Sequence, residues 1–189
     1  AGGSVTPTPY PSPQVGGEDG SAAYTVDLPI ANSYYISEAQ APYAYYRNSS
    51  DIYSFNFNYL PETTAKATFT HTFANDRTTA KIHIYKVDKE TGKAVPQGDA
   101  TLEGAVYGLY ARNDIVHPDG ATGIIFHAGD IVATLTTDEG GNAEVKNLYL
   151  GNYYVKEITP SEGYLLDEEE HDVVCDYEGD LVAEVSRST

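Results

Sequence analysis

Several residue types are scarce in this chain of 189 residues, and each scarcity excludes a class of protein. The chain has no tryptophan, no methionine and one cysteine, so no internal disulfide can stabilise it. It has 11 lysine and arginine residues against 28 aspartate and glutamate residues, which gives a formal charge of −17 at pH 7. Nucleic-acid binding needs clustered cations that contact phosphates, so we expect no nucleic-acid partner.

Long apolar runs and metal-binding patterns are scarce as well. No stretch approaches the roughly 18–20 apolar residues of a membrane-spanning helix, so we expect no membrane span in this chain. The start, Ala1-Gly2-Gly3-Ser4-Val5, lacks the charged and apolar regions of a signal peptide. The five histidines do not have the spacing of a metal site, and we expect no cofactor. We interpret the chain as a piece excised from a longer secreted protein.

One short phrase occurs twice in the sequence. Residues 34–38 read Tyr-Tyr-Ile-Ser-Glu, and residues 153–157 read Tyr-Tyr-Val-Lys-Glu. A proline follows each copy closely, at Pro42 and at Pro160. Self-similarity over this length indicates tandem copies of one structural unit. It also places a glutamate at the same point of each copy.

Turn residues and short strand-like runs divide the rest of the chain. Residues 1–21 are rich in glycine, proline and serine, which predicts a flexible or polyproline-like linker or loop. No later segment has a sustained 3.6-residue period, so we expect an all-β fold. The predicted strands of the first group span 22–28, 33–39, 52–59 and 65–73. Those of the second group span 81–87, 105–111, 131–136, 143–148, 153–158, 171–177 and 181–185.

The two groups of strands predict tandem β-sandwiches of unequal completeness. The second group, in residues 80–189, has about the seven strands of an immunoglobulin-like sandwich. The first group, in residues 22–79, has only four and matches the C-terminal half of the second. We therefore predict immunoglobulin-like sandwiches of which the first is incomplete and the second lacks its final strand.

Strand alternation places several polar side chains in core-facing positions. Period two puts Lys86 on the same face as Ile82 and Ile84, and Glu157 on the face of Val155. In the first unit, the same rule puts Glu38 on the face of Ile36 and Asn75 on the face of Phe73. Strand alternation therefore predicts that a lysine, two glutamates and an asparagine lie at core-facing positions.

A buried lone charge is expensive, so such groups lose their charge, pair or react. An uncharged lysine amine is a nucleophile, and a protonated carboxyl beside it can shuttle protons and polarise an amide. Lysine attack on an asparagine side chain, with loss of ammonia, would leave an isopeptide cross-link. The alternative is ordinary: a lysine at a strand end can extend its ammonium into water, and a terminal glutamate can pair on the surface.

Four motifs together resemble one family. Residues 84–93, 104–110, 137–148 and 153–160 are similar to successive strands and turns of collagen-adhesin B-type domains, also described as SpaA-like or prealbumin-like. These domains occur in surface proteins and pilins of Gram-positive bacteria. The resemblance spans about residues 80–185, and it implies a prealbumin-like sandwich.

The resemblance also implies roles for the core-facing polar residues. Lys86 would be the nucleophile and Glu157 the proton shuttle of the second unit. In the first unit, Glu38 would be the catalyst and Asn75 the acceptor. We expect the acceptor of the second unit roughly four residues past Thr189, and the lysine strand of the first unit is missing. We therefore expect no cross-link, and no loss of ammonia, in the chain as given.

These features predict a stalk or spacer module of a cell-wall-anchored surface adhesin or pilus-like protein, with its anchor elsewhere. Its partners would be neighbouring repeats of the same polypeptide, and it would not turn over a substrate. One alternative is a ligand-binding adhesin domain, in which exposed tyrosines and the 112–130 loop contact a host protein or glycan. Another is an accessory module of an enzyme whose catalytic domain lies outside this chain.

Three further features have simpler interpretations. Leu60-Pro61-Glu62-Thr63-Thr64 is similar to a sortase signal but lacks its glycine, so we predict a turn. The acidic run at 168–170 lacks an ordered loop of alternating calcium ligands, and we predict a solvated turn. Cys175 shares the phase of Val173, which predicts a buried, inert thiol.

Overall fold

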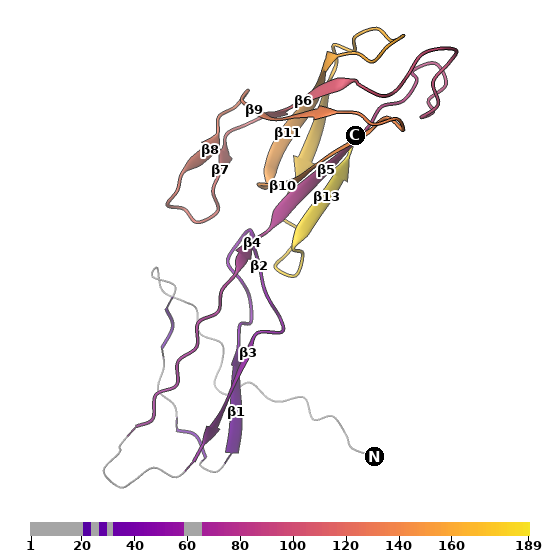
Figure 1. Ribbon diagram of the computed structural model, residues 1–189. Coiled ribbons are helices and arrows are strands. Elements are labelled where there is room, and N and C mark those ends of the chain that lie inside the picture. The colour runs from indigo at the N-terminus through magenta and orange to yellow at the C-terminus, as the bar shows by residue number, and fades with distance from the viewer. Residues whose placement is uncertain (1–20, 24–26, 30–31, 59–65) are drawn as a thin grey trace, which may run out of the picture. The chain divides into compact units, whose positions relative to one another are not determined.

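A computed structural model describes residues 21–23, 27–29, 32–58 and 66–189 (Figure 1). Within these ranges all the regular structure is β-strand, which confirms the predicted all-β class. The predicted linker, apart from Ser21, and the predicted turn at 60–64 lie outside the described residues. The described part of the chain has no helix long and apolar enough to cross a membrane.

The chain forms two compact units. Unit 1 takes in the described residues of Ala1–Ala39 and Ser49–Phe73, and unit 2 takes in Gln40–Asn48 and Ala74–Thr189. The 40–48 segment belongs to unit 2 because its strand β2 (Tyr45–Tyr46) pairs with β4 (Asp76–Arg77). The boundary that the sequence repeat suggests, at 79/80, therefore does not coincide with the division by packing.

Unit 1 contains a two-stranded antiparallel sheet of β1 (Asn32–Ser37) and β3 (Ile52–Phe57). Aromatic rings gather on one face of this sheet. The ring centroids of Tyr34 and Phe55 lie 5.8 Å apart, and that of Phe69 lies 4.1 Å from Phe55. Side chains on this face are only half-buried. A sheet of only two strands is marginal alone, which agrees with an incomplete first sandwich.

Two strands predicted in unit 1 are not found among its described residues. The described parts of 22–28 and 65–73 carry no strand. The alternation in the second segment has another cause, because its aromatic side chains pack on the β1–β3 sheet. The His71 ring, for example, stacks on Tyr53 with centroids 5.0 Å apart. Ring packing gave this segment a strand-like pattern without strand pairing.

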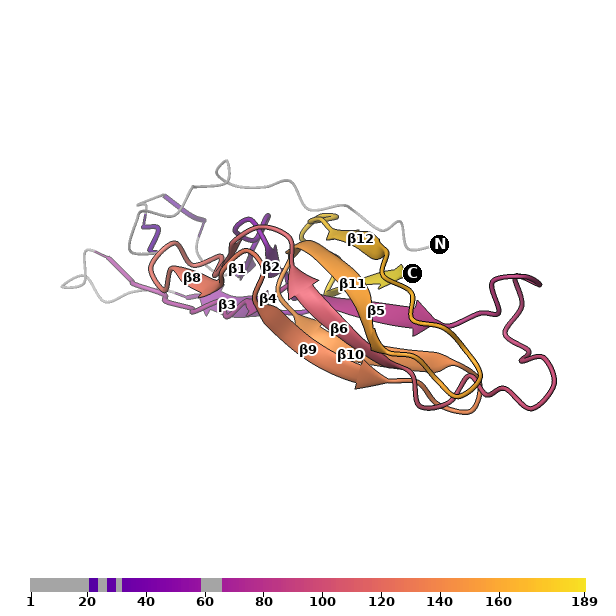
Figure 2. The same ribbon diagram turned by 90° about the horizontal axis from the view of Figure 1, so that it is seen from above.

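Unit 2 is a sandwich of two sheets (Figures 1 and 2). The larger sheet has the order β12-β11-β6-β9, with bounds Glu170–Cys175, Gly151–Thr159, Val106–Ala111 and Ile131–Thr136. Figure 2 shows β11, β6 and β9 side by side. The smaller sheet has the order β10-β5-β13, with bounds Asn142–Leu148, Thr79–Tyr85 and Glu184–Ser188. Two short strands, β7 (Ile115–Val116) and β8 (Ile124–Phe126), pair within the 112–130 segment, where no strand was predicted.

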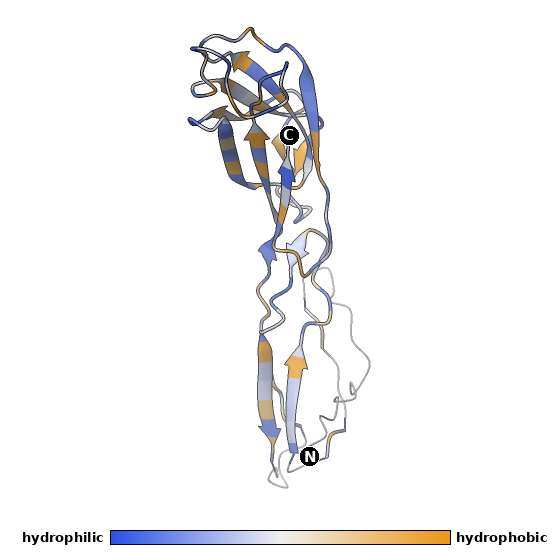
Figure 3. Cartoon of the chain, turned by 90° about the vertical axis from the view of Figure 1, so that its right-hand side faces the viewer, coloured by the Kyte–Doolittle hydropathy of each residue, from blue (hydrophilic) through white to orange (hydrophobic). Residues whose placement is uncertain are grey.

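The core of unit 2 follows strand alternation. Buried and partly buried side chains alternate along β5 and along the middle of β11. Figure 3 shows bands of hydrophobic and hydrophilic colour along strands of the chain. The core side chains that are less than 2 % exposed include Ile82, Leu109, Ile115, Tyr153, Val155 and Val185. Burial of a Val, Leu, Ile or Phe side chain stabilises a fold by about 1.5–3 kcal/mol, so this cluster supplies the main driving force for folding.

The first and last strands of the sandwich are neighbours. β13 pairs with β5 in parallel, with Glu184 opposite Thr79 and Ser188 opposite His83. In Figure 1 the two strands run side by side. The predicted last strand, at 181–185, begins too early, because Leu181 is 59 % exposed and precedes the strand. This parallel pair connects the two ends of unit 2 directly.

Arg77 in β4 forms hydrogen bonds with an irregular part of β10. The register of β10 against β5 shifts between Val145 and Leu148, and Asn147 has a φ of 59°. The Arg77 guanidinium donates to the Leu148 carbonyl at 2.8 Å and to both oxygens of Asn147 at 2.8 and 2.7 Å. It also lies 4.1 Å from the centre of the Tyr149 ring.

We expect Arg77→Ala to lower the free energy of unfolding by about 1–2 kcal/mol, because charged hydrogen bonds and a cation–π contact are lost together. Arg77→Lys keeps the charge but not the planar fork, so it should recover less than half of the loss. Urea unfolding of the three proteins measures this effect. Equal stability of Arg77→Ala and the parent would contradict it.

Candidate functional site

A lysine and a glutamate meet inside the sandwich of unit 2. Lys86 follows β5 directly, and Glu157 lies in β11 of the opposite sheet. The Lys86 Nζ donates to the Glu157 Oε1 at 2.8 Å. The two residues are 7 % and 3 % exposed. The prediction that both side chains face the core is therefore confirmed, and the surface alternative is wrong for both.

A tight turn sets the position of Lys86. Its backbone N–H donates to the Gly141 carbonyl at 2.8 Å. Gly141 has a φ of +77°, and a Cβ at this position would lie 2.6 Å from the Lys86 carbonyl oxygen. Only glycine fits this conformation and this close approach. The Asp138 carboxylate holds the turn by accepting the N–H groups of Gly140 and Asn142.

The two oxygens of Glu157 have different partners. Oε1 accepts from Lys86, and Oε2 accepts the backbone N–H of Asp167 at 2.8 Å. Tyr107 lies opposite Glu157 in the β6–β11 ladder. Burial raises the pKa of the Tyr107 phenol, and the charge of Glu157 and a hydrogen bond to it raise that pKa further. Tyr107 therefore stays protonated beside the carboxyl group.

Aromatic rings surround the amine of Lys86. Its Nζ lies 5.1 Å from the centre of the Tyr164 ring and 5.9 Å from that of Tyr107. The two rings cover the amine and help to exclude water from it. Tyr164 is held by Asp88, whose Oδ2 accepts the phenol O–H at 3.2 Å. Neither strand alternation nor the family resemblance indicated a site role for Tyr107, Tyr164 or Asp88.

Asp88 organises the turn that follows the lysine. Its Oδ1 accepts the backbone N–H groups of Glu90 and Thr91 at 3.1 and 2.8 Å. The Gln97 amide donates to both of its oxygens. The hydrogen bond from the Thr91 backbone lowers the pKa of the Asp88 carboxyl, against the opposing effect of its burial.

A lowered folded-state pKa makes stability depend on pH in a defined direction. The contribution of Asp88 is present above its unfolded pKa, near 3.8, and is lost as the pH falls through its lower folded value. We expect the stability difference between the parent and Asp88→Asn to shrink as the pH falls from 5 toward 2. Urea midpoints of both proteins across this range test it, and a difference that stays constant would contradict it.

The parallel register locates the position opposite Lys86. Ser188 lies opposite His83, so the same register places the position opposite Lys86 two residues beyond Thr189. The side chain of that position would share the inward phase of Val185. An acceptor was expected roughly four residues past Thr189, so the position opposite Lys86 lies nearer to Thr189 than that expected acceptor.

Glu38 and Asn75, the two candidates from the first sequence repeat (residues 22–79), belong to different packing units. Glu38 follows β1 in unit 1, and Asn75 precedes β4 in unit 2. Both residues are half-buried. Their proposed roles as catalyst and acceptor therefore stay a prediction.

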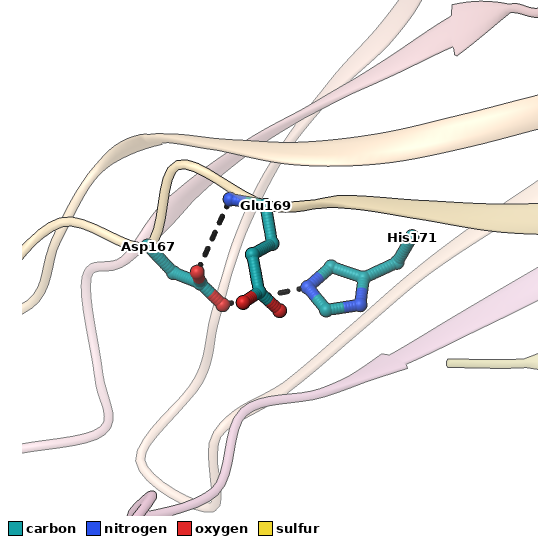
Figure 4. Close-up of side chains that lie close together, drawn as sticks. All are labelled: Asp167, Glu169 and His171. Carbon is teal, nitrogen blue, oxygen red and sulfur yellow. Dashed lines mark hydrogen bonds and ion pairs between the residues drawn. The ribbon is translucent and has the colours of Figure 1, made fainter.

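Other chemically active groups lie at the same end of unit 2 or in its core. Asp167, Glu169 and His171 direct three potential ligand atoms to within 4.8 Å of one another (Figure 4). The acidic run at 168–170 thus contributes one residue to this partly exposed group. Cys175 is fully buried, and burial raises the pKa of its thiol to about 11. The thiol is therefore protonated at neutral pH, as the predicted inert role requires.

These features define unit 2 as a prealbumin-like β-sandwich with a buried lysine–glutamate pair. The sequence profile of the SpaA family, a prealbumin-like fold domain, matches residues 80–188. That match covers more than half of the chain, and the chain belongs to this family. No curated protein sequence matches the chain.

Several solved structures are similar to parts of this chain, and one of them, with a TM-score above 0.5, supports the fold. The Bacillus anthracis TIE protein is 23 % identical with a TM-score of 0.53, over 86 % of this chain and 25 % of that one. The group B streptococcus pilus 2b backbone protein is 19 % identical with a TM-score of 0.41, over 65 % and 45 %. GBS52, the minor pilin of Streptococcus agalactiae, is 28 % identical with a TM-score of 0.36, over 59 % and 43 %. The chain thus spans between a quarter and a half of these structures.

Proposed function

We propose that this chain is part of the structural stalk of a Gram-positive surface adhesin or pilus-like protein, extracellular and attached to the cell wall through another segment. Unit 2 is a module of the type that forms an autocatalytic Lys–Asn cross-link, and its direct partners are neighbouring repeats. The observation that carries this proposal is the buried contact of Lys86 with Glu157, 2.8 Å long and placed between two sheets.

The proposed chemistry is one self-modification. Glu157 accepts a proton from the Lys86 ammonium, and the uncharged Nζ attacks the side-chain carbonyl carbon of an asparagine opposite it. The new C–N bond forms as the old C–N bond breaks. Glu157 delivers its proton to the leaving nitrogen, which departs as ammonia, and then takes the second proton of the attacking amine. Lysine ammonium, glutamate carboxylate and primary amide thus give secondary amide, ammonia and a protonated Glu157, so Glu157 acts as base, then as acid, then as base again.

The topology of unit 2 suits a load-bearing role. Force applied through the start of β5 and the end of β13 shears two parallel strands, so their ladder hydrogen bonds resist together. A bond from Lys86 to the position opposite it would carry that force directly from one strand to the other. The residues between those two points would then bear no load.

Single-molecule pulling tests this role. We would extend the chain by a short tail whose second residue is asparagine and pull it from both ends. Cross-linked unit 2 should not release the roughly 105 residues enclosed by the bond, which would otherwise add about 380 Å of extension. The same tail on Glu157→Gln serves as the control and should release this length. Full release from both proteins would contradict the proposed role.

A further inference from the structure

The loop between β11 and β12 contacts both members of the buried pair. Tyr164 places its ring 5.1 Å from the Lys86 Nζ. Three residues later, the Asp167 backbone N–H donates to the Glu157 Oε2 at 2.8 Å. One short loop therefore touches the amine on one side and the carboxyl on the other.

Hydrogen bonds to residues other than Lys86 and Glu157 hold both Tyr164 and Asp167 in place. The Tyr164 hydroxyl donates to Asp88 at 3.2 Å. The Asp167 carboxylate accepts the Glu169 N–H at 3.2 Å, and its other oxygen lies 3.4 Å from the His171 Nε2 (Figure 4). Asp167 thus uses its side chain to hold the turn and its backbone to hold Glu157.

The Asp167 backbone amide orients the Glu157 carboxyl group so that Oε1 faces the lysine. A hydrogen bond from a backbone N–H to a carboxylate is charge-assisted and directional, so it restricts rotation of the carboxyl group. With Oε2 occupied, Oε1 is the atom that faces the lysine. A general base must lie within hydrogen-bond reach of the proton it takes, and this arrangement fixes Oε1 at that distance.

We infer that Asp167 is a positioning residue for the cross-linking reaction, acting through its backbone N–H on Glu157. The inference rests on the proposed function and adds to it a residue outside the lysine–glutamate pair. It assigns the turn at Asp167, Glu169 and His171 the role of a support that holds this donor in place.

Proline substitution removes the donor specifically, because proline has no N–H. Three variants of the asparagine-tailed chain separate the contributions of Asp167. Asp167→Asn keeps the backbone N–H and a side-chain oxygen that can accept hydrogen bonds. Asp167→Ala keeps only the backbone N–H, and Asp167→Pro keeps neither. The rate of ammonia loss, followed by intact mass after refolding, is the readout, and thermal unfolding of each variant without a tail reports on folding.

We expect Asp167→Asn to react at close to the parent rate, Asp167→Ala a few-fold more slowly, and Asp167→Pro at least about tenfold more slowly than Asp167→Ala. In the 189-residue chain, Glu157→Gln should also speed hydrogen exchange at the Asp167 amide. If Asp167 had only a structural role, the variants that react more slowly would also unfold at correspondingly lower temperatures. A folded Asp167→Pro chain that reacts as fast as Asp167→Ala would overturn the inference alone. Absence of ammonia loss in the parent tailed chain would overturn the proposed function and the inference together.

Discussion

Lys86→Ala is expected to destabilise unit 2 by about 3–5 kcal/mol, which is a large share of the stability of a typical domain. The substitution leaves the Glu157 carboxyl buried at 3 % exposure without its cation. Glu157→Ala should have an effect of similar size, because it leaves the ammonium of Lys86 among aromatic rings. Urea unfolding of the 189-residue chain measures both effects, since the chain is expected to be free of the cross-link.

A double substitution provides the matched control. Lys86→Met with Glu157→Leu fills the same space with apolar side chains, and replacing a buried ion pair in this way is often neutral or stabilising. We expect this variant to be within about 1 kcal/mol of the parent or more stable. Single substitutions that cost less than about 1 kcal/mol would show that the pair is solvated, which would contradict the burial on which the site depends.

The second large effect is expected from closing the bond. A link from Lys86 to the second residue after Thr189 would enclose about 105 residues, and loop-closure entropy then predicts about 4–5 kcal/mol of added stability. We expect the urea midpoint of the asparagine-tailed chain to rise accordingly, provided that its mass shows ammonia loss. The new bond would not be sensitive to reducing agents.

The control for this effect is the same tail on Glu157→Gln combined with Lys86→Met, which can neither react nor leave a lone buried charge. Its stability should match that of the same Lys86→Met, Glu157→Gln variant without the tail. A linked chain no more stable than this control would mean that the bond strains the native sheets. That result would argue against a load-bearing role.

Alternation along strands predicted the core-facing positions of Lys86 and Glu157. Lys86 shares its face with Ile82 and Ile84, and Glu157 shares its face with Val155. Alternation left open whether the ammonium and the carboxyl reach water, and the contact between them became visible only in the structure. The repeated motif and the family resemblance then predicted the sandwich. Strand alternation is a local signal, so it can be read directly from the sequence.

The remaining parts of the site depend on contacts that sequence patterns do not encode. The Asp167 N–H is a backbone group, and its use by Glu157 depends on how a loop folds back over the sheet. Tyr164 and Asp88 are 76 residues apart and meet only because two loops pack at one end of the sandwich. The segment at 66–73 misled prediction because its aromatic spacing comes from ring stacking, as at Phe69 and Phe55.

The parallel register of β13 against β5 makes the most direct test possible, because it specifies one position and excludes its neighbours. Tails carrying a single asparagine at the first, second or third residue after Thr189 would be compared by intact mass after refolding. We expect a loss of about 17 Da for the second position only, with the branched peptide mapping to Lys86. No loss at the second position, or equal loss at the first, would contradict the claim that Lys86 and Glu157 form an isopeptide-forming site.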